Sequence, residues 1–153
     1  MAGQDHDFLL LSDEEYSSTD LLEWMDNPQA IQIHDDVLQY MLDTLNWITC
    51  YNPDLNMTKH NGLNLYGTTI IKSDGALCAE KVFAAWASMF SNGPKTIQLT
   101  GAYGWFGDDR ETGSYMKLIV DRDEMVAKFT ALANFAKRVV DSKNDLLILH
   151  LGI

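Results

Sequence analysis

Histidines and carboxylates are the residues of this chain whose types could support acid–base or metal chemistry. The sequence His34-Asp35-Asp36 places an imidazole beside two carboxylates. Three consecutive residues do not share one face of a helix, so the pattern favours an acidic helix start, with a catalytic or ligand site as the alternative. His60 lies in a polar stretch and is expected to be exposed. His150 interrupts an apolar strand and is expected to be a hydrogen-bonded core or edge histidine.

The remaining signatures of catalysis are not found in the sequence. There is no HxxxH, HExxH or CxxC spacing for zinc, and Cys50 and Cys78 are predicted to be reduced thiols in the core. We therefore predict a binding protein without catalytic residues, metal or cofactor. The enzymatic alternative is a site assembled from distant residues such as His150 and Asp121.

One short motif combines glycines with bulky aromatic residues. Gly101-Ala-Tyr-Gly-Trp-Phe-Gly107 lacks the Lys-Ser/Thr of a phosphate-binding loop, and its aromatic residues occupy positions where phosphate needs bare backbone. The motif is interpreted either as a strand end with packed aromatics or as a surface of binding anchors. The candidate anchors and the acids beside them are Tyr103, Trp105, Phe106, Asp108 and Asp109.

Acidic residues are concentrated in the first part of the chain. Twelve of the 22 carboxylates precede Lys59, the first basic residue, and the net charge is −11. Such a field repels nucleic acid and anionic membranes and attracts basic proteins. We therefore predict a basic protein partner and neither nucleic acid nor membrane. The candidate partner-binding residues here are Asp20, Glu23, Asp26, Asp35, Asp36 and Asp43, with Trp24 and Trp47 as aromatic anchors.

The spacing of apolar residues predicts four helices. Asp20 and Glu23 resemble a capping box that opens a short helix, which Asn27-Pro28 ends. Three longer segments each carry a single apolar stripe, as amphipathic helices do. They span residues 35–49, 75–91 and 122–141.

Strand-like segments alternate with these helices. The residue types predict strands at 65–71, 95–106, 114–120 and 146–153, and the last is apolar enough to be covered on both faces. The second and third read as a hairpin with a long connection. A strand at 7–11 is left open, and segments 12–20 and 52–64 are expected to be loops.

Together these elements predict an α+β fold in one domain spanning residues 1–153, with residues 1–18 partly flexible. A single, mostly antiparallel sheet of four to five strands is packed with about four helices. Because the sequence has no signal peptide and no apolar stretch of membrane-spanning length, we expect a cytoplasmic protein.

Three stretches resemble immunity proteins of bacterial polymorphic-toxin systems, of the contact-dependent inhibition and Rhs type. They are Gly62-Leu-Asn-Leu-Tyr-Gly67 with the following Thr-Thr-Ile-Ile, Ile97-Gln-Leu-Thr-Gly-Ala-Tyr-Gly-Trp105, and Leu147-Ile-Leu-His-Leu-Gly-Ile153, about a fifth of the chain. The resemblance implies a non-enzymatic cytoplasmic inhibitor. It would bind the toxin domain of its own operon, a basic nuclease by preference, and occlude its active site or substrate groove.

Because the charge is one-sided, we predict a tight one-to-one complex with a basic toxin domain, and a monomer in preference to a homodimer. The alternative from a different class is an acidic secretion chaperone of the type III kind, which works as a dimer and holds an effector segment in apolar grooves.

Overall fold

The central sheet is built from strands that come from both ends of the chain. The structure, a computed structural model, describes residues 4–153. Strand β1 (Asp5–Ser12) pairs with β8 (Leu146–Leu151), which also pairs with β5 (Thr68–Ile71). The sheet has the order β2-β1-β8-β5-β3-β4, and each strand pairing in it is antiparallel. The shorter strands are β2 (Ile31–His34), β3 (Thr49–Asn52) and β4 (Thr58–Asn61).

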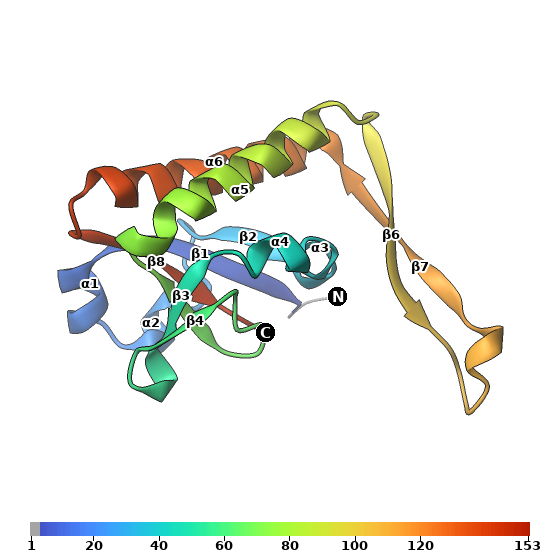
Figure 1. The fold of residues 1–153 in the computed structure, drawn as a ribbon, viewed down its shortest axis with the longest axis horizontal. Helices are drawn as coiled ribbons and strands as arrows, with labels where there is room; N and C mark the ends of the chain where they lie inside the picture. Colours follow the sequence, from blue (N-terminus) through green and yellow to red (C-terminus); the bar gives the residue numbers. More distant parts are fainter. Residues whose placement is uncertain (1–3) are drawn as a thin grey trace.

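Two long helices cover one face of this sheet (Figure 1). Helix α5 (Ser73–Ser91) and helix α6 (Arg122–Asp141) pack side by side and bury their apolar stripes against the strands. Phe8 of β1 meets Phe83 of α5 edge to face, with ring centroids 6.3 Å apart. A fully buried Phe contributes about 1.5–3 kcal/mol through the area it removes from water, so these contacts hold the helices to the sheet.

The opposite face of the sheet is also covered. Leu9, Leu11, Ile70, Leu147 and Leu149 form a second buried cluster there. Side chains from two short helices, α1 (Asp13–Ser18) and α2 (Leu21–Trp24), pack against it together with residues of β3 and the loop after it. This explains the nearly uninterrupted apolar sequence of β8, as predicted for a strand covered on both faces.

Two further short helices lie between β2 and β3. Helix α3 (Asp35–Tyr40) ends at Met41, and α4 (Leu42–Leu45) follows at once. The single helix predicted for 35–49 is therefore wrong in two ways. It is interrupted at Met41, whose ψ of 3° leaves the helical range, and its last residue is part of β3.

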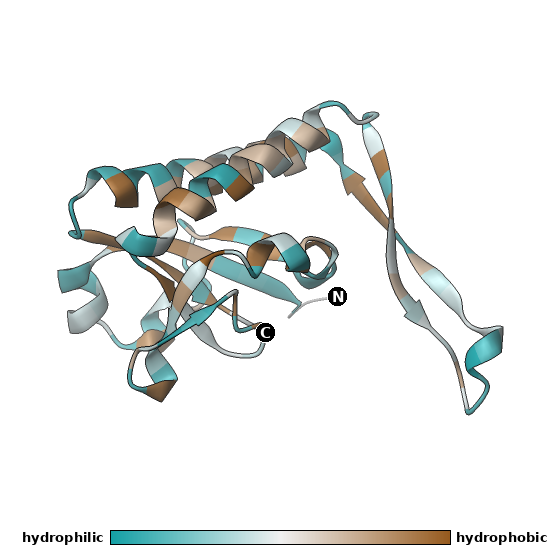
Figure 2. Ribbon diagram, in the orientation of Figure 1, coloured by the Kyte–Doolittle hydropathy of each residue, from teal (hydrophilic) through white to brown (hydrophobic). Residues whose placement is uncertain are grey.

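A separate two-stranded sheet projects from the body and is called the arm. It consists of β6 (Thr96–Gly104), a turn containing the 3₁₀ helix η2 (Arg110–Thr112), and β7 (Ser114–Asp121). The arm leaves the end of α5 and returns at the start of α6 (Figure 1). Apolar and polar residues alternate at the start of β6, whereas in β7 the apolar residues Leu118, Ile119 and Val120 follow one another; Figure 2 colours both strands by hydropathy. Only those at the base pack against the main core, namely Ile97, Leu99, Leu118 and Val120.

The α+β class is confirmed, and the finer prediction needs correction. Six helices are present in residues 4–153, and six strands form the sheet while two form the arm, instead of four to five strands in one sheet. Within the segment predicted to be partly flexible, β1 is paired with a strand on each side and Ser12 caps α1. The predicted loops are also partly wrong. Segment 12–20 contains α1, while 52–64 contains β4 and the 3₁₀ helix η1 (Pro53–Leu55). None of the helices in the described residues is long and apolar enough to cross a membrane.

Candidate partner-binding surface

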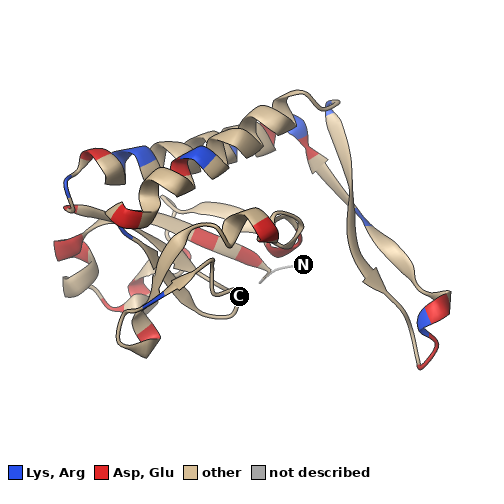
Figure 3. Ribbon diagram, viewed as in Figure 1, with Lys and Arg blue, Asp and Glu red and all other residues tan. Residues whose placement is uncertain are grey.

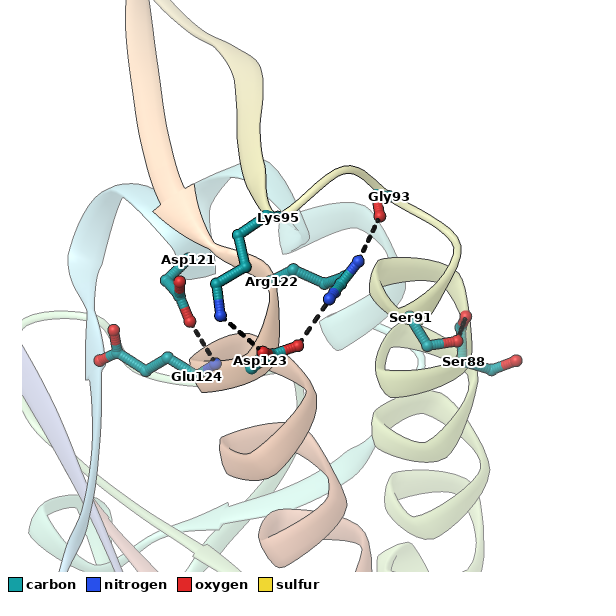
Figure 4. A network of polar contacts seen from close by, with 8 residues as sticks. All are labelled: Ser88, Ser91, Gly93, Lys95, Asp121, Arg122, Asp123 and Glu124. Carbon is teal, nitrogen blue, oxygen red and sulfur yellow. Dashed lines mark hydrogen bonds and ion pairs between the residues drawn. The ribbon is translucent and has the colours of Figure 1, made fainter.

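The base of the arm is fixed by a small polar network. Asp121, the last residue of β7, is the N-cap of α6 and accepts a hydrogen bond from the Glu124 N–H at 2.9 Å. Asp123 accepts hydrogen bonds from Lys95 Nζ at 2.9 Å and from Arg122 Nε at 3.0 Å (Figure 4). Arg122 also reaches the Gly93 carbonyl oxygen at 3.4 Å. These contacts join the two ends of the arm to each other, so the direction in which it projects is set at its base.

Aromatic residues gather at the far end of the arm. The Tyr103 and Tyr115 rings, paired across the two strands, lie 5.1 Å apart edge to face, and the Trp105 ring lies 6.2 Å from that of Tyr103. The Arg110 guanidinium lies 5.0 Å from the Trp105 ring centroid, close enough for a cation–π contact. Phe106 is 98 % exposed. The tip therefore presents aromatic surface that the rest of this chain does not cover.

Local backbone chemistry shapes this tip. The Tyr103 hydroxyl donates a hydrogen bond to the Arg110 carbonyl at 2.6 Å, and Asp109 caps η2 by accepting from the Glu111 N–H at 3.0 Å. Gly107 has a φ of +69°, which is costly for other residues. A Cβ at Gly113 would lie 2.7 Å from the Tyr103 ring. The glycines therefore permit the turn and let Tyr103 lie flat against it.

The predicted residues Tyr103, Trp105, Phe106, Asp108 and Asp109 are thus brought together on one tip. All five are exposed there. Tyr115 and Met116 of β7, which were not among the predicted residues, are 63 % and 55 % exposed on the same arm. Apolar residues occur at both odd and even positions of 115–120, so their spacing did not indicate which face of the strand is exposed. The arm has one covered face only near its base.

A cleft separates the arm from α3. It encloses about 270 Å³ and is lined on one side by Asp36, Gln39 and Tyr40 of α3. The other side is the middle of the arm, where the strand register shifts between Thr100 and Tyr103. Asp36 is the only one of the six predicted N-terminal carboxylates that lines this cleft.

The other N-terminal carboxylates do not form one continuous surface (Figure 3). Asp20, Glu23 and Asp26 lie on or beside α2, which Figure 1 shows at the end of the molecule away from the arm. Asp20 accepts a hydrogen bond from the Leu22 N–H at 3.2 Å, as its predicted capping role requires. Asp43 is exposed on α4. The charge that is concentrated in sequence is therefore distributed in space, because β1 and β2 carry the chain from one end of the sheet to the other.

The two predicted tryptophan anchors have different environments. Trp24 packs against the second buried cluster and is only partly exposed, so its role is mainly to cover the sheet. Its indole N–H is buried without a hydrogen-bond partner. Trp47, in contrast, is 65 % exposed. It lies beside α5 in a groove that also contains Leu77, Cys78 and Lys81.

Asp35 is not available to a partner, which corrects its predicted role. It is 8 % exposed and accepts hydrogen bonds from His6 Nε2 at 2.8 Å and from Gln39 Nε2 at 2.5 Å. The other ring nitrogen of His6 lies 2.8 Å from His150 Nε2. A chain of hydrogen bonds thus runs from the surface residue Gln39 to the interior and joins α3, β1 and β8.

The direction of these hydrogen bonds follows from the chemistry of the groups. The Asp35 carboxylate only accepts, so His6 donates to it through Nε2, and a single proton is shared between His6 Nδ1 and His150 Nε2. His150 Nδ1 then has no partner. Burial and, to a smaller extent, the neighbouring His6 together lower the pKa of His150 to about 3. His150 is therefore neutral, as expected for a hydrogen-bonded core histidine.

The remaining candidates for chemistry have structural roles. His34 Nδ1 accepts a hydrogen bond from the Asp36 N–H at 3.2 Å and so caps α3. His60 is not exposed as predicted, because it is half-buried and its Nε2 has no partner. Cys50 is buried, and burial raises the pKa of its thiol to about 12, which makes it unreactive. Residues 4–153 contain no group of three or more His, Cys, Asp or Glu side chains suited to a metal ion.

Comparison with known proteins adds no family to this description. The chain matches no family model, no curated protein and no solved structure.

Proposed function

We propose that this protein is a non-enzymatic inhibitor that binds and neutralises a cognate toxin domain in the cytoplasm. The observation that carries the proposal is the arm, which holds Tyr103, Trp105 and Phe106 away from the body beside Asp108 and Asp109. The resemblance to immunity proteins of polymorphic-toxin systems supplies the class of partner. A basic nuclease is the preferred toxin because a site that binds nucleic acid has a positive groove.

The shape of the arm supports insertion into such a groove. Two paired strands lie about 5 Å apart, so the tip is much narrower than the body and fits where a globular face does not. Truncating an aromatic hot-spot residue at the centre of an interface to Ala costs about 2 kcal/mol or more, which is roughly thirtyfold or more in affinity. Phe106, which is almost fully exposed, gains the most area when it is covered.

Charge is proposed to accelerate the encounter. The chain carries a net charge of −11, and the turn of the arm adds Asp108, Asp109 and Glu111 against the single base Arg110. Electrostatic steering raises association rates towards roughly 10⁸ M⁻¹s⁻¹ at low salt. Because the N-terminal carboxylates are dispersed, they contribute to this long-range field, while the tip acids are proposed to contact the partner.

The test is binding between the purified protein and the toxin domain encoded by the neighbouring gene. We expect Phe106→Ala and Trp105→Ala to weaken the complex at least tenfold through faster dissociation, and Asp108→Lys/Asp109→Lys to slow association most strongly at low salt. Leu22→Ala, on α2 and 72 % exposed, is the matched control and should bind as the wild type does. The proposal is wrong if the wild-type protein neither binds nor inhibits that domain.

A further inference from the structure

The arm of the free protein leaves apolar surface without a partner. A two-stranded hairpin is marginally stable by itself in water, and here only its base is packed against the body. Phe106, Tyr115 and Met116 are 98 %, 63 % and 55 % exposed. Met116 faces the cleft beside α3, so the exposed aromatic surface at the tip is formed by Phe106 and Tyr115 with Tyr103 and Trp105, and exposed surface of this kind marks a site of association.

A receiving surface of matching chemistry lies on the same molecule. The groove beside the first half of α5 encloses about 560 Å³ and has an apolar floor that includes Trp47, Leu77 and Val82. Trp47 is 65 % and Leu77 50 % exposed. We call it the α5 groove; the complete lining is Trp47, Asp74, Leu77, Cys78, Lys81, Val82 and Ala85.

The charges around the two surfaces are complementary. Lys81 lines the α5 groove, Lys59 lies 3.1 Å from Asp74 on its rim, and Lys72 stacks over the Tyr51 ring that hydrogen-bonds the same Asp74. Three bases, Lys59, Lys72 and Lys81, therefore lie in or beside the α5 groove, against the single acid Asp74. The tip of the arm has the opposite excess, because three acids accompany Arg110.

An arm cannot fill the groove of its own chain. It begins after the last residue of α5 and points away from the body, whereas the groove lies along the beginning of that helix (Figure 1). A helix of this length is about 28 Å long, and the arm extends a similar distance in another direction. The tip that reaches an α5 groove therefore belongs to another molecule.

We propose that in the free protein the occupant of the α5 groove is the arm tip of a second copy, exchanged reciprocally in a two-fold dimer. Both copies then make the same contact, which closes the assembly. The exposed parts of Tyr103, Trp105, Phe106 and Tyr115 offer on the order of 500 Å² per arm. With the two grooves they cover, roughly 2,000 Å² would be buried, which is the size of a stable interface. The proposal replaces the expected monomer and does not depend on the identity of a toxin.

The first test is the mass of the purified protein in solution by sedimentation and light scattering. We expect a dimer of the 17.3 kDa chain at micromolar concentration. Phe106→Asp on the tip and Leu77→Asp in the groove should each shift the protein to a monomer, raising the dimer dissociation constant at least a hundredfold. Both side chains are exposed, so neither change empties the core. Leu22→Asp is the matched control, because it replaces an exposed apolar residue on α2, and this variant should remain a dimer.

A second test locates the contact with a native thiol. Cys78 is a free cysteine in the α5 groove, whereas Cys50 is buried. In Phe106→Cys, oxidation by diamide should join the new thiol to Cys78 of the second copy, giving a covalent dimer on a non-reducing gel. The product should disappear when Cys78→Ala is added.

Three outcomes would overturn the proposal. They are a monomeric wild type, a dimer that survives both Asp substitutions, and a cross-link that persists without Cys78. Toxin binding is measured separately, and because the tip serves both contacts, the dimer is proposed only for the free protein. A dimer is also what the chaperone alternative expects, so binding of a folded toxin domain is the measurement that decides between the two functions.

Discussion

Acidification is expected to destabilise this protein through His150. The ring is fully buried, and its pKa is lowered from 6.5 to about 3. Above pH 6.5 neither the folded nor the unfolded chain binds a proton at this residue. As the pH falls below 6.5, the unfolded chain takes up a proton that the folded chain excludes, so the free energy of unfolding decreases until about pH 3.

The size of this effect follows from the shift. Between pH 6.5 and 3.8, the ordinary pKa of an Asp, the loss amounts to roughly 3–4 kcal/mol at 1.36 kcal/mol per pH unit. Typical domains are stable by about 5–15 kcal/mol, so this loss is a large part of the total. Asp74 and Asp123, whose pKa values are lowered mainly by hydrogen bonds and ion pairs, lose their contributions only at still lower pH.

The assay is urea unfolding followed by tryptophan fluorescence at a series of pH values. His150→Gln places a neutral amide donor near His6 Nδ1 and removes the titration. We expect it to cost about 1–2 kcal/mol at neutral pH, because the ring that packs 4.9 Å from Phe8 is lost, and to flatten the decline below pH 6.5. His34→Gln, at a half-exposed cap, is the control for removing a histidine. A decline of unchanged slope in His150→Gln would refute this account.

Two further predictions concern stability at neutral pH. Asp35→Ala leaves the His6 N–H buried without an acceptor and should lower the free energy of unfolding, measured with urea, by roughly 2–4 kcal/mol. Asp36→Ala, at the neighbouring and partly exposed residue, should lower it by less than about 1 kcal/mol. Equal losses in the two variants would contradict the buried network. Asp121→Ala removes the N-cap of α6 and should cost about 1 kcal/mol by the same measurement, while Asp121→Asn, which keeps a capping oxygen, should restore most of it.

The elements predicted best from sequence are those whose local signals agree with their packing. Residues 122–141 form α6 with Asp121 as its N-cap, because the apolar stripe and the capping side chain both indicate the same first residue of the helix. Segment 75–91 differs from α5 only at its start, where Ser73 and Asp74 are inside the helix and the N-cap residue is Lys72. Such helices are determined by residues close together in the sequence, so the sequence alone is enough to predict them.

The parts that were missed depend on contacts distant in sequence. β2 pairs only with β1, and β4 only with β3, so these four-residue strands owe their structure to a partner more than to their own composition. The site shows the same limit. The grouping of Tyr103, Trp105 and Phe106 was predictable because they are adjacent in sequence. The burial of Asp35 was not predictable, because its hydrogen-bond partner His6 is 29 residues away in the sequence.

The place of β8 between β1 and β5 constrains the order in which the molecule can assemble on the ribosome. The α5–arm–α6 segment can form early from local contacts, yet the strand that joins the two halves of the sheet follows every other element along the chain. Until residue 151 has emerged, Phe8 and Ile71 lack the neighbour that separates them from water. The growing chain therefore carries an open, apolar seam between β1 and β5 until β8 has emerged and paired with both.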